Sequence, residues 1–227
     1  MNLTACVVTH NRLELTKRCI ESFLATVSVP YYLVVVDNAS TDGTLEWLIA
    51  EEDSSPDLIL PLRENLYPGR ACNVGWAAAL PFNHDANLLL RADNDVEFLS
   101  GWCDELQRIF EDPKVGQVGL LEQKFEQGCS NVGGNCAIRR ELWDAGLRWN
   151  EAPWSPSETG GTRPYEDGLM SEAIMKAGYR IARVERECIK HNGWDWDAYP
   201  NYYEKTAADR GYKPDWLRGH FDRMRAL

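Results

Sequence analysis

The sequence LLLRADNDVEF, at positions 88–98, places two aspartates one residue apart directly after an apolar run. If this segment is extended, Asp93 and Asp95 point to the same side, because residues i and i+2 share a face of a strand. Their carboxylates could then converge on one hard cation. Two carboxylates with open positions suit Mg²⁺ or Mn²⁺, which keep bound waters and bridge substrate phosphates. The alternative is an ordinary turn, since Asp and Asn favour turns after strands.

The elements that must hold this pair are predicted from the hydrophobic pattern of the first half of the chain. Short apolar runs favour strands, and apolar positions at helical spacing lie between them. The predicted strands are 3–9, 31–36, 58–62 and 87–91, and the predicted helices are 15–27, 44–50 and 68–80. This alternation is typical of βαβ units with a parallel sheet.

Polar clusters follow three of these strands, at positions 9–12, 37–42 and 93–95. In open parallel sheets, ligands bind at the carboxyl ends of the strands. We therefore expect the sheet to gather the three clusters along one edge, although they lie far apart in the sequence.

The second half of the chain is less regular. The predicted elements are a helix over 100–111, a strand over 115–121, a glycine-bearing loop and short strand over 131–139, helices over 140–145 and 167–177, and a strand over 179–184. Residues 149–164 have no period and are rich in Pro, Gly and Ser, which predicts a long loop. Long loops in compact domains are often functional.

Composition limits the class of protein. The chain has 227 residues, 44% of them hydrophobic, which is enough for one large domain or two halves that share a core. The formal net charge of -11 and the pI of about 4.9 disfavour nucleic acid and anionic membranes as partners, but an anionic substrate held by a metal remains possible. No apolar run reaches about 18 residues, so no membrane span is expected.

The seven scattered cysteines include no Cys-x-x-Cys pair, and no leader peptide is expected. These features predict reduced thiols in a cytoplasmic protein. The tail from residue 199 is aromatic and mixed in charge, and it is expected to pack as an amphipathic helix. Peripheral membrane contact is the alternative.

Two other kinds of site fail on spacing. The segment 38–49 begins like a calcium loop, but its twelfth position is Ile49 rather than Glu, so the EF-hand pattern fails. A Rossmann dehydrogenase needs G-x-G-x-x-G after the first strand, and VVTHNRLEL contains no glycine.

Six segments follow one another along roughly the first 190 residues: CVVTHNR, VVVDNASTDGT, ENLYPGRACNVGWA, RADND, GGNCAIRRELWDAG and YEDGLMSEAIMKAGYRI. Each is weak alone, but together they resemble a family 2 glycosyltransferase of the GT-A fold. The resemblance implies an α/β protein with a Rossmann-like, mostly parallel sheet flanked by helices, and a smaller acceptor-side subdomain. It implies one domain over 1–227, with a nucleotide-sugar-binding half (1–98), an acceptor and catalytic half (99–198) and a C-terminal helical tail (199–227).

The resemblance also assigns residues to the donor side. Thr9, Asn11 and Arg12 would line the nucleotide pocket, and Asp37 and Asn38 would contact the base or the ribose. The other candidates for donor contact are Ser40, Asn65, Arg70, Asn73, Arg91, Asp93, Asn94, Gly133, Gly134 and Trp194.

Some of these candidates have a second interpretation. Asp37 and Ser40 also fit helix caps. Arg70 and Arg91 are either phosphate contacts or salt-bridged spectators. Gly133 and Gly134 would shape the sugar and acceptor pocket, and the Trp194 ring would either stack on the ligand or pack against the core.

The resemblance implies that Asp93 and Asp95 form a D-x-D metal motif, with Asp95 favoured as the direct ligand. His191 stands where some members have a metal- or diphosphate-binding histidine. Glu166 and Asp167 match the family's E-D pair, in which the Asp is the general base. Capping of the following helix is the alternative role for Asp167.

The implied reaction moves a sugar from a nucleoside diphosphate sugar (UDP-, dTDP- or GDP-linked) to a hydroxyl acceptor, with Mn²⁺ or Mg²⁺ and with inversion at the anomeric carbon. A nucleotidyltransferase is the rival enzyme, and a non-catalytic carbohydrate- or nucleotide-binding protein is the rival of another class. Tyr67 stands where the family usually has Gly, and Asn38 replaces a second acidic residue, so the donor pocket is expected to differ. The long loop at 149–164 is a candidate acceptor lid.

Overall fold

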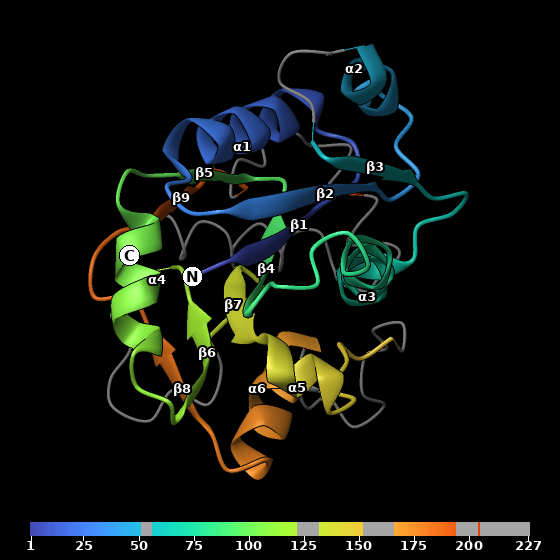
Figure 1. Cartoon of the computed structure of the whole chain (residues 1–227). Helices are drawn as coiled ribbons and strands as arrows, with labels where there is room; N and C mark the ends of the chain where they lie inside the picture. The colour runs from blue at the N-terminus through green and yellow to red at the C-terminus, as the bar shows by residue number, and fades with distance from the viewer. Residues whose placement is uncertain (51–55, 122–131, 152–165, 194–203, 205–227) are drawn as a thin grey trace.

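The computed structural model describes residues 1–50, 56–121, 132–151, 166–193 and 204 (Figure 1). The strands are β1 (Leu3–Thr9), β2 (Tyr31–Asp37), β3 (Leu58–Pro61), β4 (Leu88–Asp93), β5 (Val96–Phe98), β6 (Val115–Gly119), β7 (Cys136–Arg139), β8 (Arg180–Arg183) and β9 (Ile189–His191). The helices are α1 (Leu13–Thr26), α2 (Thr44–Ala50), α3 (Tyr67–Ala79), α4 (Trp102–Phe110), α5 (Arg140–Asp144) and α6 (Glu166–Lys176). Within these ranges, no helix is long and apolar enough to cross a membrane.

The main sheet has seven strands in the order β3-β2-β1-β4-β7-β6-β8. Strand β1 runs parallel to both β2 and β4, and β3 and β8 also pair in parallel. Only β7 is antiparallel to its two neighbours among these strands. The predicted α/β class with a mostly parallel sheet is therefore confirmed. The register pairs Thr9 with Asp37 and Val8 with Asp93, so the carboxyl ends of β1, β2 and β4 meet at one edge.

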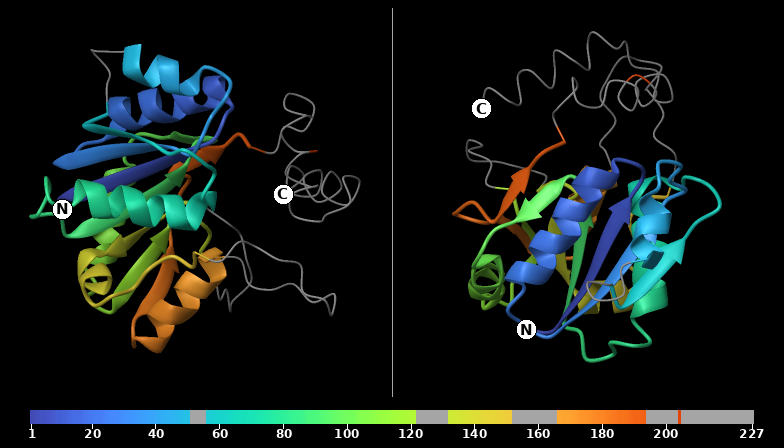
Figure 2. Two further views of the ribbon diagram at one scale, coloured as in Figure 1. Left: turned by 90° about the vertical axis from the view of Figure 1, so that its right-hand side faces the viewer. Right: turned by 90° about the horizontal axis from the view of Figure 1, so that it is seen from above.

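Both faces of the sheet are covered by helices, which explains the continuous apolar strands. Alternate residues of β1 face opposite sides: Leu3, Ala5 and Val7 pack with α1, α2 and α4, whereas Cys6 and Val8 pack with α3, α5 and α6. Figure 2 shows α1 and α3 on opposite faces of the sheet. Helix α3 lies very close to the sheet at Gly75, which has no side chain. A Cβ at this position would lie 2.7 Å from Cys6 Sγ and from Val36 Cγ2.

A second, two-stranded sheet pairs β5 with β9 and was not predicted from the sequence. Figure 1 shows β5 and β9 next to each other. The two strands run antiparallel, and Val96 is opposite His191. Each strand has only three residues, which is too short for a periodic signal. This pairing brings His191 back to the turn that follows β4.

Most of the predicted elements are present in the structure. The expected strand over 115–121 ends earlier, at Gly119, and the short strand within 131–139 is β7. Several predictions fall outside the described residues: positions 152–164 of the long loop, Trp194, and the helical tail over 199–227 apart from residue 204.

Candidate active site

The loop between β1 and α1 turns sharply at the carboxyl edge of the sheet. Asn11 (φ 57°) and Arg12 (φ 61°) both adopt the left-handed conformation, which is uncommon outside glycine, although Asn tolerates it better than most residues. The backbone N of Asn11 donates to Ser40 Oγ at 2.8 Å, and its Oδ1 accepts from the backbone N of Thr41 at 2.8 Å. The first two polar clusters are therefore held together, as the sheet topology predicted.

The loop after β2 is built on two buried polar side chains, Asp37 and Asn38. Asn38 Nδ2 donates to Asn65 Oδ1 at 2.9 Å, and Asn38 Oδ1 accepts from the backbone N of Leu66 at 2.8 Å. Asp37 Oδ2 accepts from the backbone N of Ser40 at 3.3 Å. Asp37 Oδ1 is buried and accepts no hydrogen bond within the described residues. Since buried acceptors are nearly always paired, a donor group from a ligand would complete this loop.

The D-x-D segment is a turn rather than an extended strand. Strand β4 ends at Asp93, and Asn94 and Asp95 form the turn into β5. The segment is thus not extended through Asp95, and the turn given as the alternative is observed. Their carboxylates have different partners: Asp93 contacts Arg91 and Asn135, whereas Asp95 contacts Arg12 and His191.

Asn94 is a buried link between this turn and the loop after β1. Its Oδ1 accepts from Arg12 Nη2 at 2.6 Å. Its Nδ2 lies 3.0 Å from Thr9 Oγ1, 2.9 Å from the Asn11 carbonyl O and 2.8 Å from Thr16 Oγ1. An amide NH₂ carries two protons, so protein acceptors already use its donor capacity. Asn94 thus fixes the turn after β4 to the loop after β1. A contact between Asn94 and the nucleotide sugar stays a prediction.

Asp95 is a buried carboxylate that lies between an arginine and a histidine. Its Oδ2 accepts from Arg12 Nη1 at 2.8 Å, and its Oδ1 lies 3.6 Å from His191 Nε2. Burial alone would raise the pKa of Asp95, but His191 and Arg12 hold that pKa below its ordinary value. The carboxylate is therefore ionised at neutral pH. Gly193 packs against it so closely that a Cβ would meet Asp95 Oδ2 at 2.0 Å.

Arg91 joins the end of β4 to the start of α6. Its Nη2 donates to Asp93 Oδ1 at 3.4 Å and to Glu166 Oε1 at 3.2 Å. The salt-bridged alternative for this residue is thus observed, and a phosphate contact remains a prediction. Gly134 permits the arrangement, because a Cβ there would lie 2.9 Å from Arg91 Nη2.

Asp167 lies in the first turn of α6, where the helix dipole favours a carboxylate over a neutral acid. Its Oδ1 accepts from the backbone N of Gly168 at 2.8 Å. This contact lies within the first turn of the helix, and the roles of Asp167 as helix cap and as general base both stay predictions. Neither role excludes the other.

Two residues of α3 that were predicted to contact the sugar donor contact the segment that follows α5. Asn73 Nδ2 donates to the Trp149 carbonyl O at 2.9 Å, and Asn73 Oδ1 accepts from the Trp149 backbone N at 3.0 Å. Arg70 is half-exposed, with its Nε 3.8 Å from Glu151 Oε2. Contact of either residue with the donor stays a prediction.

Sequence reasoning missed three contributors: Asn135, Trp149 and Gly193. The backbone N of Asp93 donates to Asn135 Oδ1 at 2.8 Å, and the Trp149 ring lies under the Arg91 guanidinium, 4.5 Å from Arg91 Cζ to the ring centroid. Asn135 lies in the segment GGNCAIRR, and an asparagine beside two glycines could have indicated a functional loop there. Trp149 and Gly193 gave none, because their roles depend on tertiary contact.

Asp95 and His191 are the side chains that fit a divalent ion. Asp95 Oδ1 is buried and accepts no hydrogen bond within the described part of the chain, and His191 Nε2 is 3.6 Å away. The described residues contain no group of three or more His, Cys, Asp or Glu side chains that could hold a metal. Two protein ligands with open positions fit an ion that takes its other ligands from substrate phosphates and water.

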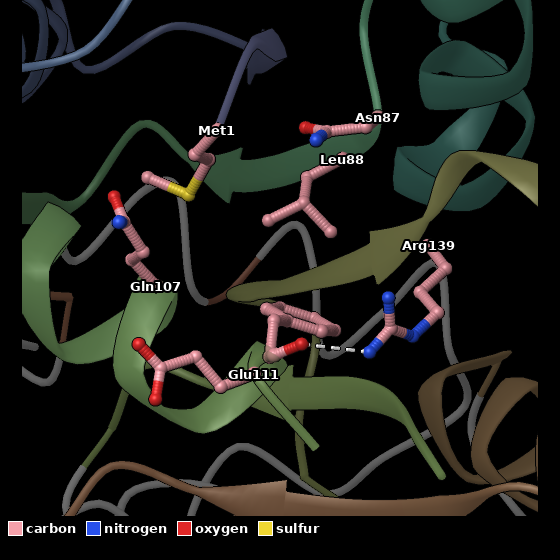
Figure 3. A pocket seen from close by; sticks show the side chains of 7 residues that line it. Met1, Asn87, Leu88, Gln107, Glu111 and Arg139 are labelled. Atoms are coloured by element: carbon pink, nitrogen blue, oxygen red, sulfur yellow. Dashed lines mark hydrogen bonds between the residues drawn. The ribbon is translucent and has the colours of Figure 1, made fainter. Parts of the chain in front are cut away.

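A pocket of about 180 Å³ lies elsewhere in the molecule (Figure 3). It is formed by Met1, Asn87, Leu88, Gln107, Phe110, Glu111 and Arg139. Asn87 and Leu88 stand at the start of β4, at the amino end of the strand. The pocket is thus separate from the polar clusters at the carboxyl edge.

The family model of glycosyl transferase family 2 matches residues 4–144. An uncharacterized glycosyltransferase from Nostoc sp. is 31% identical over 80 residues, a stretch that covers 35% of this chain and 25% of the relative. The matched region of the family includes the three polar clusters at the carboxyl edge of the sheet.

Two solved structures share the fold. The mannosyltransferase PcManGT from Pyrobaculum calidifontis, in complex with GDP-Man and Mn²⁺, has a TM-score of 0.68 and 19% identity, with 91% of this chain and 61% of that chain covered. TarS residues 1–349 from S. aureus, in complex with UDP-GlcNAc, has a TM-score of 0.63 and 17% identity, with 97% and 71% covered. This chain thus spans less than two thirds of the mannosyltransferase, and at these identities the likeness is one of fold.

Proposed function

Because this chain belongs to glycosyl transferase family 2, we propose that it moves a sugar from a nucleoside diphosphate sugar to a hydroxyl acceptor. The observation that carries the proposal is the position of the polar clusters. Three loops, after β1, β2 and β4, meet at the carboxyl edge of the sheet and are tied together by Asn94 and Asn11. That edge is where open α/β sheets bind ligands.

The donor nucleotide would lie over the loops after β1 and β2. Asp37 Oδ1, buried without a hydrogen bond in the described residues, would accept from a ribose hydroxyl or a base N–H. Thr9, Asn11 and Asn38 position this loop pair through their own hydrogen bonds. The presence of Asn38 beside Asp37 leaves uridine, thymidine and guanosine diphosphates as candidates for the donor.

Asp95 and His191 would hold Mn²⁺ or Mg²⁺ beside the diphosphate. Asp93, the first aspartate of the D-x-D motif, would also face this ion. When bound, the ion would stabilise the negative charge that develops on the leaving nucleoside diphosphate. Arg12 keeps Asp95 ionised and fixes its orientation. His191 Nδ1 accepts from the backbone N of Gly193 at 3.2 Å. Ligation through Nε2 requires the tautomer with a proton on Nδ1, so this Gly193 contact would open.

Asp167 would act as the general base. An acceptor hydroxyl has a high pKa and must lose its proton as it attacks the anomeric carbon, and a positioned carboxylate can take that proton. Attack from the side opposite the leaving group inverts the anomeric centre. Glu166 would orient this end of α6 through its contact with Arg91.

Neither rival function gains support from the site. A nucleotidyltransferase would need a basic, glycine-rich loop near β1, and the loop after Thr9 offers Arg12, whose guanidinium contacts Asp95 and Asn94. A non-catalytic binding protein has no need for an ionised Asp95 beside a histidine together with a carboxylate at the start of α6. A turnover measurement separates these classes.

Donor hydrolysis, with water as the acceptor, tests the proposal without knowledge of the natural acceptor. Wild type and Asp167→Asn would be incubated with UDP-GlcNAc or GDP-mannose and Mn²⁺, and the released nucleotide would be measured. We expect Asp167→Asn to lose about 100-fold in kcat, as is usual for a missing general base. Asp104→Asn is the matched control, because Asp104 is also in the first turn of a helix but is exposed on α4.

The stereochemistry gives a second readout in the same reaction. NMR spectra recorded early in the reaction should show the free sugar in the anomeric form opposite to that of the donor. Retention of the donor's anomeric form would reject inversion. Full activity in Asp167→Asn would reject this aspartate as the base.

A further inference from the structure

Arg91 is a buried cation in the middle of the main sheet. Its side chain is 2% exposed, although it carries a charge on β4, one of the central strands. Burying a charge is costly unless the charge is paired. An arginine side chain is not deprotonated in proteins, so the buried guanidinium is a cation and needs partners.

The two acidic partners of Arg91 come from different halves of the site. Asp93 ends β4 on the donor side, and Glu166 begins α6 on the acceptor side. Arg91 Nη2 reaches both, at 3.4 Å to Asp93 Oδ1 and 3.2 Å to Glu166 Oε1. One nitrogen atom therefore sets the separation between the end of β4 and the start of α6.

Trp149 limits the position of the guanidinium from another side. Arg91 Cζ lies 4.5 Å from the centroid of the Trp149 ring. The Trp149 backbone is itself fixed by two hydrogen bonds with Asn73 on α3, one accepted by its carbonyl and one donated by its N–H. Helix α3 also packs tightly at this point, because a Cβ on Gly69 would lie 3.2 Å from both Trp149 Cβ and Glu166 Cγ. Arg91 thus has little freedom to move.

A second arginine shows what a purely structural role looks like in this fold. Arg139 lies over the Phe110 ring, and its guanidinium donates to the backbone carbonyls of Val115, Phe110 and Asp112. In Arg91, by contrast, Nε and Nη1 are buried without a hydrogen bond within the described residues. Buried ion pairs are weak evidence for stability, so stability alone does not account for Arg91.

We propose that Arg91 is a positioning residue that fixes the E-D pair of α6 relative to the D-x-D turn, acting through Glu166. This inference rests on the proposed function, because the E-D pair is placed there as the base end of the reaction. Arg91 would not touch the donor. Its effect would be to keep Asp167 at the distance from the donor that attack requires.

Arg91→Met and Arg139→Met form a matched pair of test variants, with the same substitution in two arginines stacked on aromatic rings. Hydrolysis of UDP-GlcNAc and GDP-mannose would be measured at saturating Mn²⁺, alongside the melting temperature. We expect Arg91→Met to lose about 100-fold in kcat, the size of loss that a misplaced catalytic group can cause, with KM within about 3-fold. Arg139→Met should lower the melting temperature but keep kcat. Equal kcat in both variants would overturn the proposal.

Glu166→Gln tests the same contact without emptying the core, because the Glu166 side chain is 26% exposed. We expect it to reduce kcat with little change in KM. The double variant Arg91→Met/Glu166→Gln should lose no more than the more damaged single variant, because both remove one contact. Multiplied losses would show that Arg91 does not act through Glu166.

Hydrogen exchange keeps the two proposals separate. Arg91→Met should speed amide exchange in the first turn of α6, and Arg139→Met should leave it unchanged. Unchanged exchange in Arg91→Met would overturn the positioning role, even in an active enzyme. If wild type hydrolyses neither donor, the proposed function loses its support, whereas the exchange result still decides whether Arg91 holds α6.

Discussion

Tyr67 holds a backbone conformation that a tyrosine rarely adopts. Its φ of 63° lies in the left-handed region, which costs roughly 1–2 kcal/mol for a residue with a Cβ. The strain is tolerated because the Tyr67 backbone N donates to Asn65 Oδ1 at 2.9 Å and Pro68 follows in the first turn of α3. The resemblance found in the sequence implies a glycine at this position, where the chain has Tyr67. The fold thus keeps the loop geometry that a glycine would provide, but with a half-exposed ring.

Replacing Tyr67 by glycine should therefore stabilise the fold. We expect Tyr67→Gly to raise the free energy of unfolding by about 0.5–1 kcal/mol, because glycine adopts positive φ without a steric penalty but loses more backbone entropy on folding. Urea unfolding curves of the two proteins would measure this difference. A clear loss of stability would show that ring contacts outweigh the backbone strain.

Asp95 should make stability depend on acidity. Because Arg12 and His191 lower the pKa of Asp95 in the folded chain despite burial, the unfolded chain binds a proton at higher pH than the folded one. The stabilisation that ionised Asp95 gives the folded chain is complete above the ordinary aspartate pKa of about 4. It is lost as pH falls through the lowered pKa of the folded state.

Asp95→Asn removes this contribution. Urea unfolding between about pH 2.5 and 6 should show a shallower loss of stability on the acid side for Asp95→Asn than for wild type. Parallel pH profiles of the two proteins would contradict the ion pair with Arg12.

Types and spacing of residues predicted which side chains gather at this edge of the sheet, but not the hydrogen bonds that they make there. Asp95 and His191 were expected at one site, and they lie 3.6 Å apart. Asn94 was expected to touch the donor, yet its amide binds Thr9, Thr16 and the Asn11 carbonyl. Such a role depends on three segments meeting around one side chain, which no local pattern encodes.

Helix α3 holds the Trp149 backbone through one asparagine. Asn73 satisfies both the N–H and the C=O of Trp149, which is buried. Removing this side chain would leave two backbone groups without partners. Trp149 in turn carries the Arg91 guanidinium, so a change on α3 should reach the carboxylates of the site.

Asn73→Ala should therefore reduce both stability and turnover. We expect a loss of about 2–4 kcal/mol in the free energy of unfolding, since each unsatisfied buried group costs roughly 1–3 kcal/mol, together with a fall in kcat for donor hydrolysis.

Asn83→Ala is the control for this prediction. Asn83 Nδ2 donates to the Leu3 carbonyl O and to Thr4 Oγ1, at the amino end of the sheet. This variant should lose stability but keep kcat. The same kcat loss in both variants would contradict a specific link from Asn73 to the site.

The order of strands and helices followed from hydrophobic period, and the parallel pairing of β1, β2 and β4 followed from their alternation with helices. The antiparallel β7 was beyond reach, because its four residues, CAIR, carry no signal of direction. The β5–β9 sheet was missed because strands of three residues depend on partners about 90 positions away. These long-range pairings are what deliver His191 and Asn135 to the site.

The molecule as a whole is acidic, with a formal net charge of -11, and its proposed donor is an anion. Such a chain repels a diphosphate unless local cations offset the charge. Arg12 and Arg91 are buried and already contact carboxylates, so the proposed function assigns the offsetting positive charge to a divalent ion. Donor binding should therefore require metal.

Thermal unfolding with and without Mn²⁺ is the most direct test of this central claim. Wild type would be measured with UDP-GlcNAc and with GDP-mannose, and compared with Asp95→Asn and the control Asp104→Asn. At about 100 times the dissociation constant, a ligand adds about 2.7 kcal/mol of stability, or roughly 5–10 °C for a chain of this size. We predict that one donor gives such a shift only with Mn²⁺, in wild type and Asp104→Asn but not in Asp95→Asn. A shift that is independent of Mn²⁺, or that survives in Asp95→Asn, would contradict the metal-dependent transferase.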